Sequence, residues 1–279
     1  MTVGIGGCTL ETERAPPVPQ PGRSPLLEIR AVTRSFYGVH ALTGVDLAVQ
    51  PGLVTGLIGP NGAGKTTLFN CISGVIPPSS GRILFDGRDI TGWRPDRITR
   101  QGLVRTFQIA RGCPRMTVRE NLLLYGPAQP GESVATALLR TSAMRRREGE
   151  LQQRAIDIAG RLRLSAVLDN KAAALSGGQK KLLEIGRALM TRPKLILLDE
   201  PIAGVNPTLA VEIGEQLRAI AADGITLLLI EHQMDMIARL CDHVIVMAEG
   251  RRLTEGSFAE VASDATVQEA YMGRPRGLA

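Results

Sequence analysis

The chain has 279 residues, 44% of them hydrophobic and only 3% aromatic, with a formal net charge of +6 at pH 7. This length suits one large domain or two small ones with an aliphatic core, and no apolar run approaches the roughly 20 residues that a membrane-spanning helix needs. The basic residues are scattered, and the densest run, 145–147, lies beside two glutamates. We therefore interpret the charge as a solvated surface and expect no nucleic-acid partner.

The first 25 residues contain the stretch APPVPQPGRSP and several glycines, so we expect a disordered leader there. It has no basic region followed by an apolar core and therefore does not resemble a signal peptide. The four cysteines form no C-x-x-C pair and match no zinc-binding spacing, which favours a reduced, cytosolic compartment.

From residue 26 the pattern predicts secondary structure. LLEIRAVTRSF and ALTGVDLAVQPG contain strand-like segments broken by glycine, and LVTGLIG (53–59) is a short apolar strand. TTLFNCISG (66–74) has helical character, and RILFDG (82–87) is typical of another strand ending in a turn. These segments predict the first part of an α/β domain.

The region from about Asp96 to Arg192 is mostly helical in pattern, including VRENLLLYG and the long stretch 133–168. Three short apolar runs follow: KLILLDE (194–200), ITLLLIEH (225–232) and HVIVMAEG (243–250). Continuous apolar runs of this length are typical of parallel strands buried on both faces, and a helical segment separates the first two. The order predicts an α/β core interrupted by a helical insert.

GPNGAGKTT (59–67) matches the phosphate-binding loop G-x-x-x-x-G-K-[ST], between a predicted strand and a predicted helix. The glycines let backbone N–H groups surround a phosphate chain, Lys65 would reach the β- and γ-phosphates, and the Thr66 hydroxyl would bind Mg²⁺. A glycine-rich turn is the plain alternative, but this context favours nucleotide. We assign ATP binding to Gly59, Asn61, Gly62, Ala63, Gly64, Lys65, Thr66 and Thr67.

Two predicted strand ends carry chemistry that complements this loop. In a P-loop fold we expect a parallel strand neighbouring the P-loop strand to end in an acid near Mg²⁺, and Asp199 fits that role. Alternation along the strand end would aim Glu200 elsewhere, toward the γ-phosphate and its water. His232 ends another strand at the sheet edge where ligands of open α/β sheets bind. Gln108, by itself, would be a surface glutamine.

A second anion-binding pattern is LSGGQKKLLEIGRALM (175–190), in which Ser176, Gly177 and Gly178 precede a helical run. Free N–H groups and the helix dipole favour an anion at such a terminus. Leu182, Ile185, Gly186 and Leu189 recur at helical spacing and predict the buried face of this helix.

The phosphate loop, Gln108, LSGGQ, Asp199-Glu200 and His232, in this order, resemble the ATP-binding subunit of an ABC transporter over residues 26–273. The resemblance implies a P-loop core of about 26–108 and 190–250, a helical subdomain of about 109–189, a C-terminal segment 251–273 and a tail 274–279. It implies that Phe36, or the adjacent Tyr37, stacks on adenine. It also implies that Gln108 and Asp199 contact Mg²⁺, that Glu200 is the general base, and that His232 contacts the γ-phosphate.

The resemblance further implies that two cassettes stack head to tail, so that Ser176, Gly177, Gly178 and Gln179 contact the ATP held by the partner chain. One departure concerns the turn after the acidic pair, where AGVN puts Asn206 at a position that is usually Asp. The amide keeps hydrogen-bonding capacity but loses the charge. Lys65, Glu200 and His232 are all present, which argues against an inactive, regulatory cassette.

A narrower resemblance rests on RTFQ followed by MTVRENLLL, and on KKLLEIGRALM, DEPIAGVNP and VQEAYMG. These segments are similar to importers for branched-chain amino acids and their relatives for urea and short amides. The resemblance implies ATP and Mg²⁺ as cofactors, a second cassette (identical or different), integral membrane permeases, and indirectly an extracytoplasmic solute-binding protein. The chain would then lie on the cytoplasmic face of the membrane. The alternative is a soluble ABC-type ATPase acting on nucleic acid or ribosomes.

Overall fold

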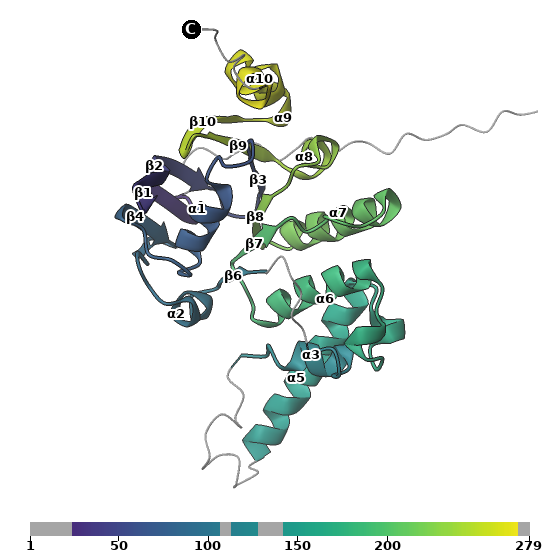
Figure 1. The fold of residues 1–279 in the computed structure, drawn as a ribbon. Helices are drawn as coiled ribbons and strands as arrows, with labels where there is room; N and C mark the ends of the chain where they lie inside the picture. Colours follow the sequence, from purple (N-terminus) through teal and green to yellow (C-terminus); the bar gives the residue numbers. More distant parts are fainter. Residues whose placement is uncertain (1–23, 107–112, 128–141, 273–279) are drawn as a thin grey trace, which may run out of the picture.

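A six-stranded sheet runs through the middle of the molecule in the computed structural model, which describes residues 24–106, 113–127 and 142–272 (Figure 1). The strand order is β10-β9-β3-β8-β7-β6, in which β10 is antiparallel to β9 and the other neighbours are parallel. The strands are β3 (Val54–Ile58), β6 (Leu103–Arg105), β7 (Leu195–Asp199), β8 (Thr226–Ile230), β9 (His243–Ala248) and β10 (Arg251–Gly256).

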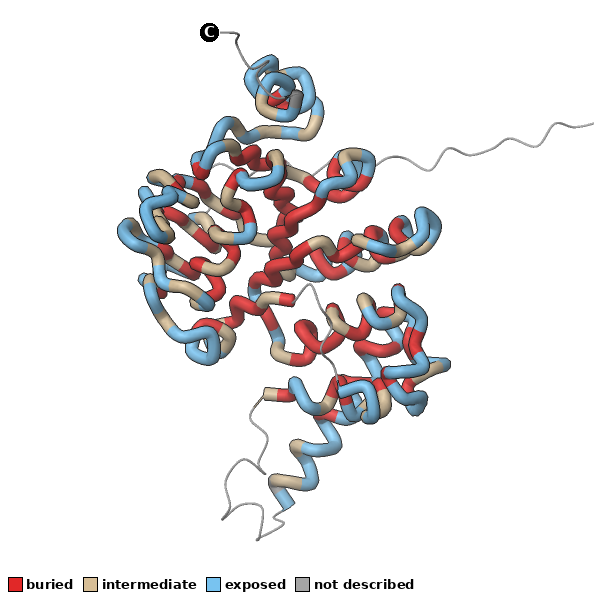
Figure 2. Tube along the Cα trace, viewed as in Figure 1, coloured by how far each residue is buried: buried red, intermediate tan, exposed pale blue. Residues whose placement is uncertain are grey.

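Every residue of β3, β7 and β8 is buried, as their continuous apolar sequences predict. In Figure 2 the central sheet is the buried (red) part of the chain that runs between more exposed segments on either side. Alternation along β7 divides its side chains between two cores. Ile196 and Leu198 join the core with the helical insert, whereas Leu195 and Leu197 join the core with the second sheet.

The second sheet is antiparallel, with the order β2-β1-β4-β5, and lies with α1 on one side of the central sheet (Figure 1). Helices α7 and α8 cover the other side (Figure 1). The elements are β1 (Leu27–Phe36), β2 (Val39–Val49), β4 (Ser80–Phe85), β5 (Arg88–Asp89), α1 (Lys65–Ile72), α2 (Pro95–Arg100), α7 (Pro207–Ala222) and α8 (Met234–Leu240).

The insert contains α3 (Val118–Leu123), α5 (Ser142–Arg161) and α6 (Gly177–Met190), with 3₁₀ turns at Ser165–Val167 and Ala172–Ala174. It packs below α7 in Figure 1, so the predicted α/β core with a helical insert is confirmed. The helical periodicity of α6 is also confirmed, because all four residues that predicted its inner face are buried. The C-terminal part adds α9 (Phe258–Ser263) and α10 (Ala265–Met272).

Two features of the sheet differ from the sequence prediction. Asp199 ends β7, which we expected beside the P-loop strand β3, but β8 lies between them and pairs with both. In addition, β6 lies inside the region that has a mostly helical pattern. It has only three residues and pairs with β7, a distant segment of the chain, so local periodicity does not reveal it.

Candidate functional site

The loop between β3 and α1 has a backbone that only glycine accommodates at two positions. Gly59 and Gly64 have φ values of +148° and +97°. A Cβ atom at Gly59 would lie 2.0 Å from the carbonyl oxygen of Met247, and one at Gly64 would lie 2.6 Å from that of Ala41. The loop therefore turns tightly against its neighbours and leads into α1, whose first N–H groups are available to an anion.

Lys65 is the first residue of α1 and is only 6% exposed. Its ammonium donates hydrogen bonds to the carbonyl oxygens of Gly59 (2.6 Å) and Pro60 (3.0 Å). Burial lowers the pKa of Lys65, while the negative charges of Glu200 and Asp199 act in the opposite direction. The cation thus sits inside the phosphate loop, within electrostatic reach of both acidic residues.

Glu200 and His232 meet at the edge of this loop. His232 Nε2 lies 3.1 Å from Glu200 Oε1, although the two residues follow different strands, β8 and β7. Both line a pocket of about 250 Å³ with the phosphate loop. The lining residues are Ala41, Asn61, Gly62, Ala63, Gly64, Lys65, Thr66, Thr67, Glu200, Ile230 and His232. The structure therefore brings together the loop and two of the three predicted catalytic residues; the third, Gln108, lies outside the described residues.

Asp199 does not line that pocket and is paired with an arginine instead. Its carboxylate is 5% exposed and pairs with Arg105, whose Nη2 lies 3.0 Å from Asp199 Oδ2. Arg105 Nη1 also donates to Asn70 Oδ1 on α1 at 2.6 Å. Sequence reasoning missed Arg105, and its only signal is its place in RTFQ, three residues before Gln108.

The oxygen atoms available here are of the kind that Mg²⁺ prefers. Thr66 lines the pocket, and the Asp199 carboxylate lies close enough to Lys65 for its charge to raise the pKa of that ammonium. Among the described residues no group of three His, Cys, Asp or Glu side chains could hold a metal ion. Mg²⁺ usually binds one or two protein oxygens together with substrate phosphates and water, and Thr66 and Asp199 fit that pattern.

The turn after β7 connects these residues to α7. Glu200 has a positive φ of +49°. Ile202 donates its N–H to the buried carboxylate of Glu231, a second residue that sequence reasoning missed, at 3.0 Å. At the end of the turn, Asn206 caps α7 by accepting a hydrogen bond from the Leu209 N–H at 2.9 Å. The amide at the position usually held by Asp therefore serves as a helix cap.

Ser176 caps α6 at the second anion-binding pattern. Its hydroxyl accepts from the Gln179 N–H at 3.2 Å, and the Gln179 side chain accepts from the Ser176 N–H at 3.0 Å. Ser176 and Gly177 are exposed, whereas Gly178 is buried against Leu209 of α7. None of the signature residues 176–179 lines the pocket at the phosphate loop.

The aromatic residues at the end of β1 do not line that pocket either. The Phe36 ring is covered by the Arg34 guanidinium at 4.6 Å from its centroid. The Tyr37 side chain is fully exposed on a residue with φ of +46°. The choice between these residues as an adenine platform therefore stays a prediction.

A family model described as "ABC transporter" matches residues 42–203, more than half of the chain, including the phosphate loop, the LSGGQ signature and Asp199-Glu200. The chain belongs to the ABC transporter family. It is an ATPase of the subfamily of branched-chain amino acid transport ATP-binding proteins.

Similar proteins match this ABC ATPase over almost their full length. It is 44% identical to a probable branched-chain amino acid transport ATP-binding protein, LivG, of Methanocaldococcus jannaschii, over 89% of this chain and 97% of the relative. It is 38% identical to the high-affinity branched-chain amino acid transport ATP-binding protein BraF of Pseudomonas aeruginosa, over 89% and 98%. A crystal structure of an ATP-binding cassette of an ABC transporter in its ADP conformation superposes with a TM-score of 0.79 at 43% identity, covering 90% of this chain and 100% of that one.

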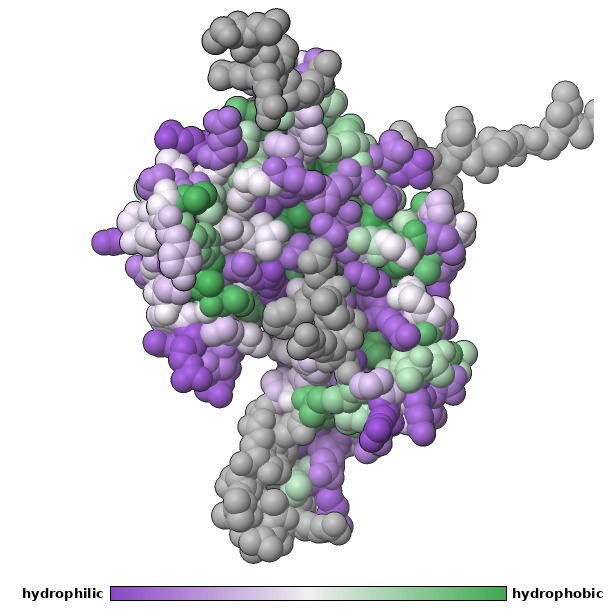
Figure 3. Space-filling view, in the orientation of Figure 1, coloured by the Kyte–Doolittle hydropathy of each residue, from purple (hydrophilic) through white to green (hydrophobic). Residues whose placement is uncertain are grey.

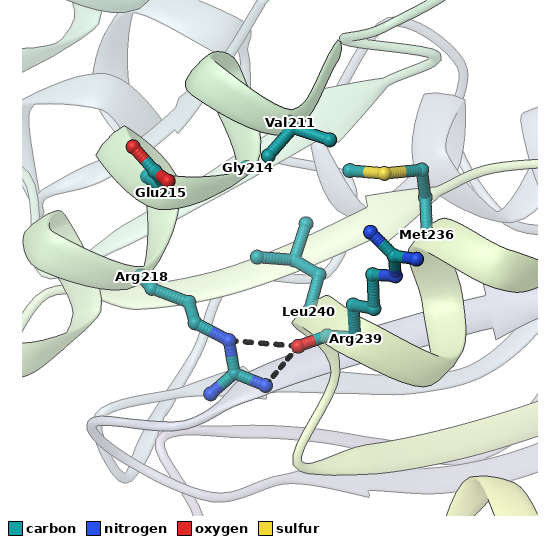
Figure 4. A pocket seen from close by; sticks show the side chains of 7 residues that line it. All are labelled: Val211, Gly214, Glu215, Arg218, Met236, Arg239 and Leu240. Atoms are coloured by element: carbon teal, nitrogen blue, oxygen red, sulfur yellow. Dashed lines mark hydrogen bonds between the residues drawn. The ribbon is translucent and has the colours of Figure 1, made fainter. Parts of the chain in front are cut away.

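Another pocket of the ABC ATPase lies between α7 and α8, and no residue of the phosphate loop lines it. Figure 4 shows Arg218 donating to the Arg239 carbonyl oxygen across this space. Its lining residues are Val211, Gly214, Glu215, Arg218, Met236, Arg239 and Leu240.

Among the described helices, none has the length and apolar character needed to cross a bilayer. Hydrophilic side chains cover much of the molecular face that Figure 3 shows.

Proposed function

We propose that this ATPase energises an importer for branched-chain amino acids or related amides and urea, with ATP binding closing a dimer of cassettes and hydrolysis reopening it. The observation that supports this proposal is that the two predicted phosphate-binding segments of the chain share no pocket. The loop at Lys65 is paired with Glu200 and His232, whereas the N-terminus of α6 at Ser176 opens to solvent. A head-to-tail dimer would bring the second site of each chain onto the nucleotide of the other.

The proposed reaction is attack of water on the γ-phosphorus, which breaks the bond between the γ-phosphorus and the oxygen bridging to the β-phosphate and releases ADP and phosphate. Glu200 accepts the proton of that water, and His232, 3.1 Å away, fixes the orientation of the carboxylate and contacts the γ-phosphate. Lys65 exchanges its loop carbonyl partners for phosphate oxygens. Mg²⁺, held through Thr66, Gln108 and Asp199, would neutralise phosphate charge.

The proposed assembly follows from this role. Two cassettes, identical or different, would act with integral membrane permeases, and an extracytoplasmic solute-binding protein would deliver the solute. The cassette would then lie on the cytoplasmic face of the membrane. The names of its relatives as transport ATP-binding proteins support this reading over a nucleic-acid or ribosomal role. We also propose that the core (about 26–108 and 190–250), the helical subdomain (about 109–189) and the C-terminal segment (251–273) are distinct units.

A complementation experiment tests the shared site. Lys65→Ala should lose ATP binding, and Ser176→Arg should keep ATP binding but lose hydrolysis. In a mixture of the two, a mixed dimer has one site with an intact loop and an intact signature. If the cassette pairs with copies of itself at random, an equimolar mixture should recover about a quarter of the wild-type rate, because half of the dimers are mixed and each has one working site.

Glu200→Gln supplies the matched test of the chemistry. This variant should bind ATP, accumulate as a dimer on size-exclusion chromatography with light scattering, and hydrolyse little. Normal turnover by Glu200→Gln would contradict the assignment of the base. Full hydrolysis by Ser176→Arg alone would contradict the dimer.

A further inference from the structure

Glu231 is a buried carboxyl group between two pocket residues, Ile230 and His232, and no step of the proposed reaction uses it. It follows β8 directly, precedes His232, and is only 3% exposed. Buried carboxyl groups are rare unless they have partners that repay the loss of water. The contacts of Glu231 therefore indicate what it does.

The two oxygen atoms of Glu231 bind the two functional segments of the pocket edge. Oε1 accepts the N–H of Ile202, 29 positions earlier in the chain, at 3.0 Å. Oε2 accepts the N–H of His232 at 3.2 Å. One carboxylate thus connects the turn that carries Glu200 to the segment that carries His232.

The turn held in this way is strained. Glu200 has φ of +49°, a region that residues with a side chain rarely adopt. Its N–H donates to the Ile230 carbonyl at 3.0 Å, and its carbonyl accepts from Lys181 Nζ of α6 at 3.2 Å. Strained residues persist where the surrounding structure fixes them from several sides, and the Glu231–Ile202 bond holds the far side of this turn.

Stability alone does not explain a carboxyl group at this position. Burial raises the pKa of Glu231, and the nearby charge of Glu200 acts in the same direction, although the two N–H donors and His232 oppose the shift. An apolar residue of similar size often costs the fold less than a buried ionisable group. What Glu231 supplies that an apolar residue cannot is its pair of hydrogen bonds to the Ile202 and His232 N–H groups.

We propose that Glu231 is a positioning residue for ATP hydrolysis, which holds the turn bearing Glu200 in register with His232 through its bonds to Ile202 and His232. This inference rests on the proposed roles of Glu200 and His232. The bond to Ile202 also reaches α7, because the same turn ends at the Asn206 cap. Glu231 therefore holds in place the turn that connects Glu200 to α7, and α7 packs against Gly178 of the signature.

The experiment compares Glu231→Gln with Glu231→Leu. Both side chains have nearly the volume of glutamate, but only glutamine retains an oxygen that can accept the Ile202 N–H. Thr226→Val is the matched control, because Thr226 is buried at the other end of β8 and its hydroxyl accepts the Gly52 N–H at 2.9 Å. ATP affinity, kcat, KM and the thermal midpoint are measured for each variant of the full chain.

Glu231→Leu should lower kcat at least about tenfold with KM and ATP affinity unchanged, because the reacting groups lose their alignment but the phosphate loop is intact. Glu231→Gln should stay within about threefold of wild type, since one hydrogen bond can be kept. Thr226→Val should lower the thermal midpoint and leave kcat unchanged.

Equal kcat values for Glu231→Leu and wild type would overturn this role. A parallel loss in Glu231→Leu and Thr226→Val would overturn it as well, because it would show a general effect on folding. Failure of the wild-type chain to hydrolyse ATP, alone or mixed with a second cassette, would instead overturn the proposed function.

Discussion

The two adjacent glycines of the signature make opposite predictions when each is replaced by alanine. Both belong to the first turn of α6, but a Cβ atom at Gly177 would meet nothing within 4 Å. A Cβ atom at Gly178 would lie 1.9 Å from Cδ2 and 2.7 Å from Cγ of Leu209. The methyl group of alanine therefore has room at position 177 but would clash with Leu209 of α7 at position 178.

For Gly177→Ala we expect an unchanged or higher free energy of unfolding, by up to about 1 kcal/mol, since alanine favours helix more than glycine. For Gly178→Ala we expect a loss of about 1–3 kcal/mol, because Leu209 must leave its position and the surrounding packing must adjust. Urea unfolding followed by circular dichroism measures both. Leu209→Ala in the Gly178→Ala background should recover part of that loss, as the two sites are in contact.

The rate of ATP hydrolysis tests the exposed glycine, Gly177, separately from stability. Gly177→Ala should bind ATP normally, yet hydrolyse it on the order of a hundredfold more slowly, because in the proposed dimer the methyl group would hold the partner's nucleotide away from the helix terminus. Wild-type hydrolysis by Gly177→Ala would refute the close approach of a nucleotide to α6. Equal stability of the two alanine variants would refute the packing argument.

Two further predictions concern buried groups. Arg105→Met should lower the free energy of unfolding by about 3 kcal/mol, because it leaves the buried carboxylate of Asp199 unpaired. Arg119→Met removes one side of an exposed ion pair and should leave the free energy of unfolding nearly unchanged, so equal urea midpoints for the two variants would contradict this reasoning. At pH 8 a thiol-alkylating reagent should label the exposed Cys113 and spare Cys71 and Cys241 until the chain unfolds. Burial raises their pKa values to about 11 and about 12, which leaves thiolate fractions of about 10⁻³ and 10⁻⁴; rapid labelling of Cys241 in peptide mass spectrometry would show that the core opens.

The features that the sequence predicted well depend on neighbouring residues. The phosphate loop needs glycine at fixed offsets before a helix, and the structure gives Gly59 and Gly64 backbone conformations that suit only glycine. The helix that begins after Ser176 is equally local, because its apolar residues recur at helical spacing. The continuous apolar runs predicted β7 and β8 because strands buried on both faces leave no polar side in the pattern.

Only the tertiary structure decided how distant segments meet. The insertion of β8 between β3 and β7, and the three-residue β6, follow from pairing between distant segments that no local period encodes. Arg105 reaches Asp199 across 94 positions of sequence. The sequence by itself predicted which groups would bind and cleave a phosphate chain, because the residue types and spacings that this chemistry needs occur in short motifs. Folding decided which buried partners, above all Arg105 and Glu231, hold those groups in place, because their role depends on contacts and burial.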